Sequence, residues 1–176
     1  MNKPFVFCTL VTLIFLTSCS TLPEGVKAIE NFEKNRYLGK WYEIVRLDVS
    51  FEKNLNNTRA EYSLNEDGTI RVINRGYNTK KQKWTKAVGK AKFIGEENIG
   101  RLKVSFFWPF YGSYNVIALD NDYQYALVAG PNLNYLWLLS RETHVPDDIK
   151  SEYLKIAEEI GFNTKDLLWI EHNRSK

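Results

Sequence analysis

The chain has 176 residues and a formal net charge of +3. About 150 residues beyond the amino-terminal segment suffice to bury most of the apolar surface of a single domain, so one domain is expected rather than several. The small net charge, with lysines scattered along the chain, argues against a nucleic-acid partner.

The first eighteen residues have the pattern of a signal peptide. A basic start at Lys3 is followed by an apolar run over residues 5–16. This run is shorter than the roughly 20 residues that a membrane-spanning helix needs. Residues 1–18 are therefore predicted to be removed during export rather than kept as a membrane helix.

The end of this leader, Leu16-Thr17-Ser18-Cys19, resembles the lipobox of bacterial lipoproteins. The resemblance implies that Cys19 carries a thioether-linked diacylglycerol and becomes the first residue of the mature protein. Two or three acyl chains anchor stably, because each buried methylene contributes about 0.8 kcal/mol. Ser20 stands where lipoproteins of the inner membrane often carry Asp, which implies the outer membrane. An ordinary secretory signal that happens to contain a cysteine is the alternative.

The mature chain would have no free cysteine, since Cys8 leaves with the leader and Cys19 is acylated. No disulfide or thiolate metal site is therefore expected. No cofactor is predicted. Residues 19–34, with Pro23 and Gly25, are predicted to form the acylated amino terminus and a tether. Residues 35–176 are predicted to form the folded domain.

Alternation of apolar and polar residues with period two dominates from residue 36 to residue 141 and predicts β-strands. The turn before the third predicted strand carries the hairpin signal Asp67-Gly68. No helix lies between the strands, so an antiparallel sheet is favoured over a parallel one. The predicted strands cover residues 38–46, 59–64, 69–77, 86–93, 102–106, 114–119, 125–129 and 135–141.

The strand at residues 86–93 alternates most clearly, and its inward residues are small. Its lysines would face water, and Ala87, Gly89 and Ala91 would face the interior. Small inward residues are expected where a barrel encloses a cavity. The alternative is that large side chains from the opposite wall fill this space.

The strand at residues 135–141 is apolar on both faces, so another element must cover its outer side. Pro146 opens a predicted amphipathic helix that ends at Gly161, and residues 166–170 form a short final strand or docked segment. The predicted fold is an eight-stranded antiparallel up-and-down β-barrel with one packed carboxyl-terminal α-helix.

Three short motifs carry a resemblance to a known family. The segment Gly39-Lys40-Trp41-Tyr42-Glu43-Ile44 resembles the Gly-x-Trp motif of the lipocalins, in the form typical of bacterial lipocalins. Asp120-Asn121-Asp122-Tyr123 is similar to the second lipocalin motif, and Arg141 to the third. Residues 103–120 also resemble outer-membrane lipocalins, so the resemblance covers essentially the whole chain. We interpret six motif residues as determinants of the fold: Gly39, Trp41, Asp120, Asp122, Tyr123 and Arg141.

Trp41 and Arg141 are expected to pair at the closed end of the barrel. A guanidinium group over an indole face contributes about 0.5 to 2 kcal/mol and would plug the floor of the barrel.

The lipocalin resemblance implies a cup for a small hydrophobic molecule, with fatty acids or lysophospholipids as ligands and a role in envelope lipid maintenance or stress. Inward residues toward the wider end should line this cup, although each could instead pack the core. The candidate ligand-binding residues are Tyr62, Val72, Asn74, Ala87, Gly89, Val104, Phe106, Tyr114, Val116 and Trp137.

Two other functions compete with ligand transport. An enzyme would need a catalytic group, and Glu43 is the best candidate because His144 and His172 lie in peripheral segments. One carboxylate is not a mechanism, so no catalysis and no metal site are expected. A purely structural envelope lipoprotein would instead have a filled barrel. Aromatic residues near Phe107 and Trp108 would form either a homodimer surface or a membrane contact.

Overall fold

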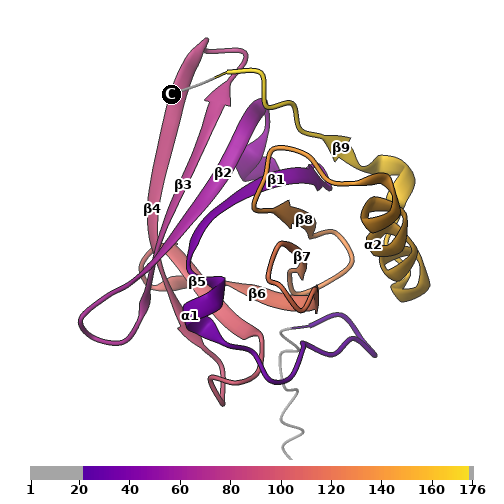
Figure 1. Ribbon diagram of the computed structural model, residues 1–176. Helices are drawn as coiled ribbons and strands as arrows, with labels where there is room; N and C mark the ends of the chain where they lie inside the picture. Colours follow the sequence, from indigo (N-terminus) through magenta and orange to yellow (C-terminus); the bar gives the residue numbers. More distant parts are fainter. Residues whose placement is uncertain (1–21, 175–176) are drawn as a thin grey trace, which may run out of the picture.

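The computed structural model describes residues 22–174, which form one barrel with a helix on its outside (Figure 1). The leader, Cys19 and Ser20 lie outside the described residues. The strands are β1 (Gly39–Arg46), β2 (Leu55–Leu64), β3 (Ile70–Asn78), β4 (Lys83–Phe93), β5 (Arg101–Phe107), β6 (Phe110–Leu119), β7 (Tyr125–Ala129), β8 (Leu136–Ser140) and β9 (Leu168–Trp169). The helices are α1 (Lys34–Tyr37) and α2 (Asp147–Ile160), with short 3₁₀ turns at Ser50–Glu52 and Thr164–Asp166.

Strands β1 to β8 close into an antiparallel barrel. Each strand pairs with the next along the chain, β8 returns to β1, and β1 also pairs with β2. The predicted eight-stranded up-and-down barrel with a carboxyl-terminal helix is therefore confirmed. Closure satisfies the backbone groups that the edges of an open sheet would expose.

Strand β1 changes neighbours along its length. Its first half, residues 39–42, pairs with β2, and a register shift follows between Glu43 and Val45. Beyond that shift the carboxyl-terminal segment lies between β1 and β2: the Ile170 amide donates to the Ile44 carbonyl at 2.9 Å, and the Asn57 amide donates to the Glu171 carbonyl at 3.0 Å. The end of the chain thus completes the wall where β1 and β2 separate.

The closed end is built around Trp41, which is fully buried. Its indole N–H donates to the Tyr37 carbonyl at 2.8 Å, and the Arg141 guanidinium lies 3.9 Å from the centroid of its ring. Arg141 also donates to the carbonyls of Lys40 at 2.8 Å and Arg36 at 2.7 Å. Arg141 thus satisfies backbone carbonyls around the floor as well as covering the indole.

The other motif residues shape two turns at the same end. Gly39 has a φ of +94°, a region that favours glycine, and a β-carbon there would lie 3.4 Å from Nη1 of Arg141. The Asp120 carboxylate accepts hydrogen bonds from the amides of Asp122, Gln124 and Tyr125, at 3.0, 2.7 and 2.6 Å. It therefore holds the β6–β7 turn in one conformation.

Helix α2 covers the outer face of β7 and β8. Tyr153 and Ala157 are buried against Leu127, Leu136 and Leu138 in a second hydrophobic core outside the barrel. The helix ends at Gly161, which has a φ of +102°. The prediction that an amphipathic helix covers this doubly apolar strand is confirmed.

The second half of the predicted tether packs onto the domain. Ala28 and Phe32 are buried, and the Ile29 amide donates to the Val116 carbonyl at 2.9 Å. Both hydrophobic cores and all nine strands lie within residues 22–174, so a chain that begins at Ser20 retains the whole folded unit. Among the described residues no helix is long and apolar enough to cross a membrane.

Candidate ligand-binding site

The register of β2, β3 and β4 places the predicted ligand residues in two rows on the inner wall. Tyr62 lies opposite Val72, and Val72 lies opposite Gly89. One step nearer the mouth, Ala60 lies opposite Asn74, and Asn74 opposite Ala87. Side chains of directly paired residues project from the same face of a sheet, so each row faces the interior together.

The interior is closed at its floor and open toward its mouth. Tyr62, Val72 and Val116 are buried in the core cluster around Trp41, and Val104, Tyr114 and Trp137 pack against that cluster while remaining partly exposed. Nearer the mouth, Asn74 is partly exposed and Ala87 is exposed. Exposure of the inward-facing residues therefore increases from the floor toward the mouth.

The small residues of β4 do not all leave space. A β-carbon on Gly89 would lie 2.7 Å from the Ser105 carbonyl oxygen and 2.9 Å from the Phe106 ring, so Phe106 covers the inner side of this glycine. The space at Gly89 is thus filled from the adjacent strand β5, not from the opposite wall as the alternative proposed, whereas Ala87 is exposed.

Three tyrosines form a hydrogen-bonded cluster in the interior. The hydroxyl of Tyr114 lies 2.6 Å from that of Tyr37, and Tyr62 donates to Tyr114 at 3.0 Å. Burial raises the pKa of all three phenols, which therefore remain protonated in neutral solution. Three hydroxyl protons share two mutual hydrogen bonds, which leaves one donor for a ligand oxygen.

Tyr37 was absent from the sequence-based set because it precedes the first strand and no period-two pattern includes it. Helix α1 brings it beneath the barrel, where its ring centroid lies 4.8 Å from that of Trp41.

A buried ionic cluster lies on the mouth side of this floor. Arg46, only 1% exposed, has its Nε 3.0 Å from Glu43 and 3.2 Å from Glu52. Arg46 also donates to the Glu52 and Leu55 carbonyls at 2.8 and 3.2 Å, and Trp137 donates its indole N–H to Glu52 at 3.1 Å. The cluster joins β1 and β8 to the loop that contains the Ser50–Glu52 turn.

Burial raises the pKa of both carboxyls in this cluster. For Glu43 the neighbouring Glu52 raises the pKa further, while Arg46 opposes the rise. For Glu52 the hydrogen bond from Trp137 and the charge of Arg46 oppose the effect of burial.

Of this cluster the sequence indicated only Glu43, which lies two residues after Trp41 and so faces the same side of the strand. Regular alternation would place Arg46 on the outer face. It faces inward because the register shift after Glu43 reverses the alternation.

Asn74 offers a further polar group to the interior. Its side-chain oxygen is buried and has no hydrogen-bond partner among residues 22–174. A ligand hydroxyl or ammonium that donated to this oxygen would satisfy it. Within the same residues no group of three or more His, Cys, Asp or Glu side chains could hold a metal ion.

Comparison with known proteins agrees with the barrel and its motifs. The model of the lipocalin-like domain family matches residues 32–172. The outer membrane lipoprotein Blc of Citrobacter freundii is 49% identical over 163 residues, covering 93% of this chain and 92% of that protein. The protein of the same name from Escherichia coli K12 is 47% identical with the same coverage. Insecticyanin from the tobacco hornworm Manduca sexta superimposes with a TM-score of 0.69 at 17% identity, covering 86% of this chain and 87% of that one, which shows the fold alone.

Proposed function

This chain belongs to the lipocalin family, and we propose that it binds fatty acids or lysophospholipids at the outer membrane and stores or carries them for envelope lipid maintenance. The observation that carries the proposal is the interior gradient, from a buried aromatic floor around Trp41 to the exposed Ala87 near the mouth. An apolar wall with a few polar groups is the usual composition of a lipid-binding site.

The interior supplies separate partners for the two parts of such a ligand. An acyl tail would cover the partly exposed apolar residues, including Val104, and would gain about 25 cal/mol for each Å² buried. The polar end would accept a hydrogen bond from the tyrosine cluster or donate one to Asn74. Asn74 favours a ligand with a hydroxyl or ammonium group, as a lysophospholipid has, over a simple fatty acid.

We propose binding rather than catalysis as the function of this interior. Glu43, the best sequence-based candidate for a catalytic acid or base, is held by Arg46 at 3.0 Å. Its neighbours thus support a structural role, since a general base needs access to the proton that it removes.

The chain is located at the outer membrane, in keeping with its likeness to outer membrane lipoproteins of Citrobacter freundii and Escherichia coli. We propose that acyl chains on Cys19 hold it there, as the lipobox implies. The few residues between Cys19 and the packed segment at Ala28 keep the barrel close to the lipid surface.

Replacing Cys19 with Ala is expected to move the protein from the membrane fraction to the soluble fraction of the cell envelope, because acyl attachment requires the thiol. Fractionation followed by immunoblotting checks this outcome, with Cys8→Ala as the matched control that should remain membrane-bound. Membrane retention of the Cys19→Ala protein with its leader removed would contradict anchoring through this residue.

Filling the interior near the mouth is expected to weaken ligand binding. Ala87→Phe adds a bulky ring beside Asn74, where the ligand would lie, and displacing about two methylene contacts lowers affinity about tenfold. Titration of the delipidated chain from Ser20 with a lysophospholipid and with a fatty acid, followed by tryptophan fluorescence, measures the change. The control is Val88→Phe on the outer face of the same strand, which should leave affinity unaltered.

Native mass spectrometry of the same protein gives an independent readout of co-purified lipid. If neither lipid changes the fluorescence and no lipid co-purifies, the carrier proposal fails. If Ala87→Phe and Val88→Phe weaken binding equally, the ligand does not occupy the interior.

A further inference from the structure

The tip of the β5–β6 hairpin exposes three large aromatic side chains. Phe107, Trp108 and Phe110 are 81%, 83% and 77% exposed. A cluster of exposed aromatic residues marks an interaction surface, because water contact with such groups is unfavourable.

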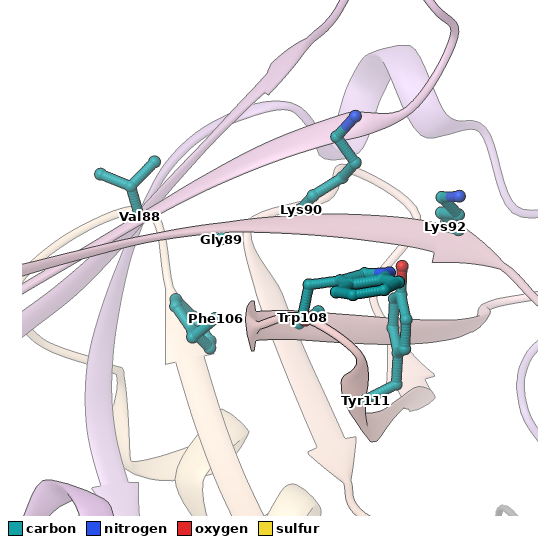
Figure 2. A pocket seen from close by; sticks show the side chains of 8 residues that line it. Val88, Gly89, Lys90, Lys92, Phe106, Trp108 and Tyr111 are labelled. Atoms are coloured by element: carbon teal, nitrogen blue, oxygen red, sulfur yellow. The ribbon is translucent and has the colours of Figure 1, made fainter.

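A hollow of about 350 Å³ lies between this hairpin and strand β4 (Figure 2). It forms because β4 and β5 pair only over residues 90–93 and separate beyond them. Lys90 and Lys92 project from β4, and Trp108 and Tyr111 come from the hairpin (Figure 2). Basic groups and aromatic rings therefore line the same hollow.

Lysines are concentrated along β4 and the turn before it. Residues 78–93 contain six lysines and no acidic residue, whereas residues 147–171 contain seven acidic residues and three lysines. Helix α2 lies on the side of the barrel away from β4 (Figure 1). Lysines that look scattered in the sequence are thus gathered on one flank, where Lys90 forms a salt bridge with Asp67 at 2.9 Å.

We propose that this docking face, made of Lys86, Lys90, Lys92, Phe107, Trp108 and Phe110, rests on a lipid bilayer that contains anionic phospholipids. Lysines attract the negatively charged headgroups, and aromatic rings are stable at the boundary between headgroups and acyl chains. The acidic helix side then faces away from the membrane. This contact does not involve the acyl anchor. It brings the hollow, which Gly89 and Phe106 of the candidate ligand site also line, to the lipid surface.

A second copy of the chain is a poorer occupant of the same face. In a symmetric dimer the same patch meets itself, so the lysines of both copies would be gathered in one interface. Like charges placed opposite each other oppose association. An anionic bilayer complements the aromatic and the basic parts together.

Sedimentation with lipid vesicles tests the proposal, using the chain from Ser20 so that no acyl anchor contributes. We expect binding to vesicles of phosphatidylcholine mixed with phosphatidylglycerol, weakened by salt, and little binding to phosphatidylcholine alone. The double variant Lys86→Glu, Lys92→Glu should weaken binding at least about 25-fold, because the loss of each lysine lowers the affinity about fivefold. Trp108→Ser should weaken it independently and reduce the blue shift of tryptophan emission on binding.

Two matched controls place the effect on this face. Lys155→Glu with Lys165→Glu makes the same charge change on the helix side, and Trp169→Ser removes another exposed tryptophan. Both controls should bind vesicles as the parent chain does. Ala87→Phe should also bind vesicles normally, and the docking variants should keep their affinity for soluble ligand, so this proposal and the carrier proposal can fail separately.

Equal binding to both kinds of vesicle, or equal losses in the docking and control variants, would overturn the proposal. Sedimentation equilibrium without lipid tests whether a second copy of the chain occupies this face instead. Self-association that is abolished by Trp108→Ser, with no vesicle binding by the parent chain, would assign the face to a second copy instead.

Discussion

Trp41→Ala is expected to lower the free energy of unfolding by about 4 kcal/mol, since truncating a buried tryptophan typically costs 3–5 kcal/mol. Trp41 is 0% exposed, lies under the Arg141 guanidinium and donates its indole N–H to the Tyr37 carbonyl. The substitution removes all three contributions and leaves a cavity at the floor. Natural domains are stable by only about 5–15 kcal/mol, so the loss takes a large share of the total.

Urea unfolding followed by far-ultraviolet circular dichroism measures this effect without relying on tryptophan fluorescence. Trp108→Ala is the matched control, because Trp108 is 83% exposed and its truncation should change stability by no more than about 0.5 kcal/mol. A loss below about 1 kcal/mol for Trp41→Ala would show that the floor can collapse around the missing ring.

Arg46→Met is expected to destabilise the protein by about 3–5 kcal/mol at neutral pH, because it leaves two buried carboxyls without their cation. Arg46 lies within 3.2 Å of both Glu43 and Glu52. Burial already raises the pKa of both carboxyls, and removing the guanidinium raises it further. The variant therefore binds more protons when folded than when unfolded.

The sign of the pH dependence follows from these raised pKa values. A carboxyl whose pKa is higher in the folded state stabilises the fold below its unfolded pKa, and this stability is lost as pH rises through the folded pKa. The unfolding free energy of Arg46→Met should thus fall as pH increases above the ordinary glutamate range, and fall more steeply than that of the parent chain. Urea unfolding at a series of pH values measures both slopes.

Adding Glu43→Gln and Glu52→Gln to Arg46→Met separates charge from packing. The triple variant carries no buried charge at this position, so it should recover much of the stability and lose the steep pH dependence. Failure to recover, together with a loss that is the same at every pH, would mean that Arg46 acts through its hydrogen bonds to the Glu52 and Leu55 carbonyls instead.

The inner wall was predictable where alternation is regular, and it was missed where the strand is irregular. Tyr62, Val72, Asn74, Ala87 and Gly89 lie on well-paired strands and share the interior face, as their period indicates. Arg46 follows a register shift in β1. Such a shift reverses which side the later residues of the strand face, and the alternation of apolar and polar residues does not reveal it. Tyr37 precedes the strands altogether.

The sequence by itself determined the barrel, its covering helix and the family, because period-two alternation, short turns and three motifs are local properties of the chain. Only the tertiary structure decided which side chains meet across the interior: the Tyr37–Tyr62–Tyr114 cluster, the Glu43–Arg46–Glu52 cluster and the cover of Gly89 by Phe106. It also gathered the lysines of β4 beside the exposed hairpin. These contacts depend on barrel closure and on one register shift, which join residues that are distant in the chain.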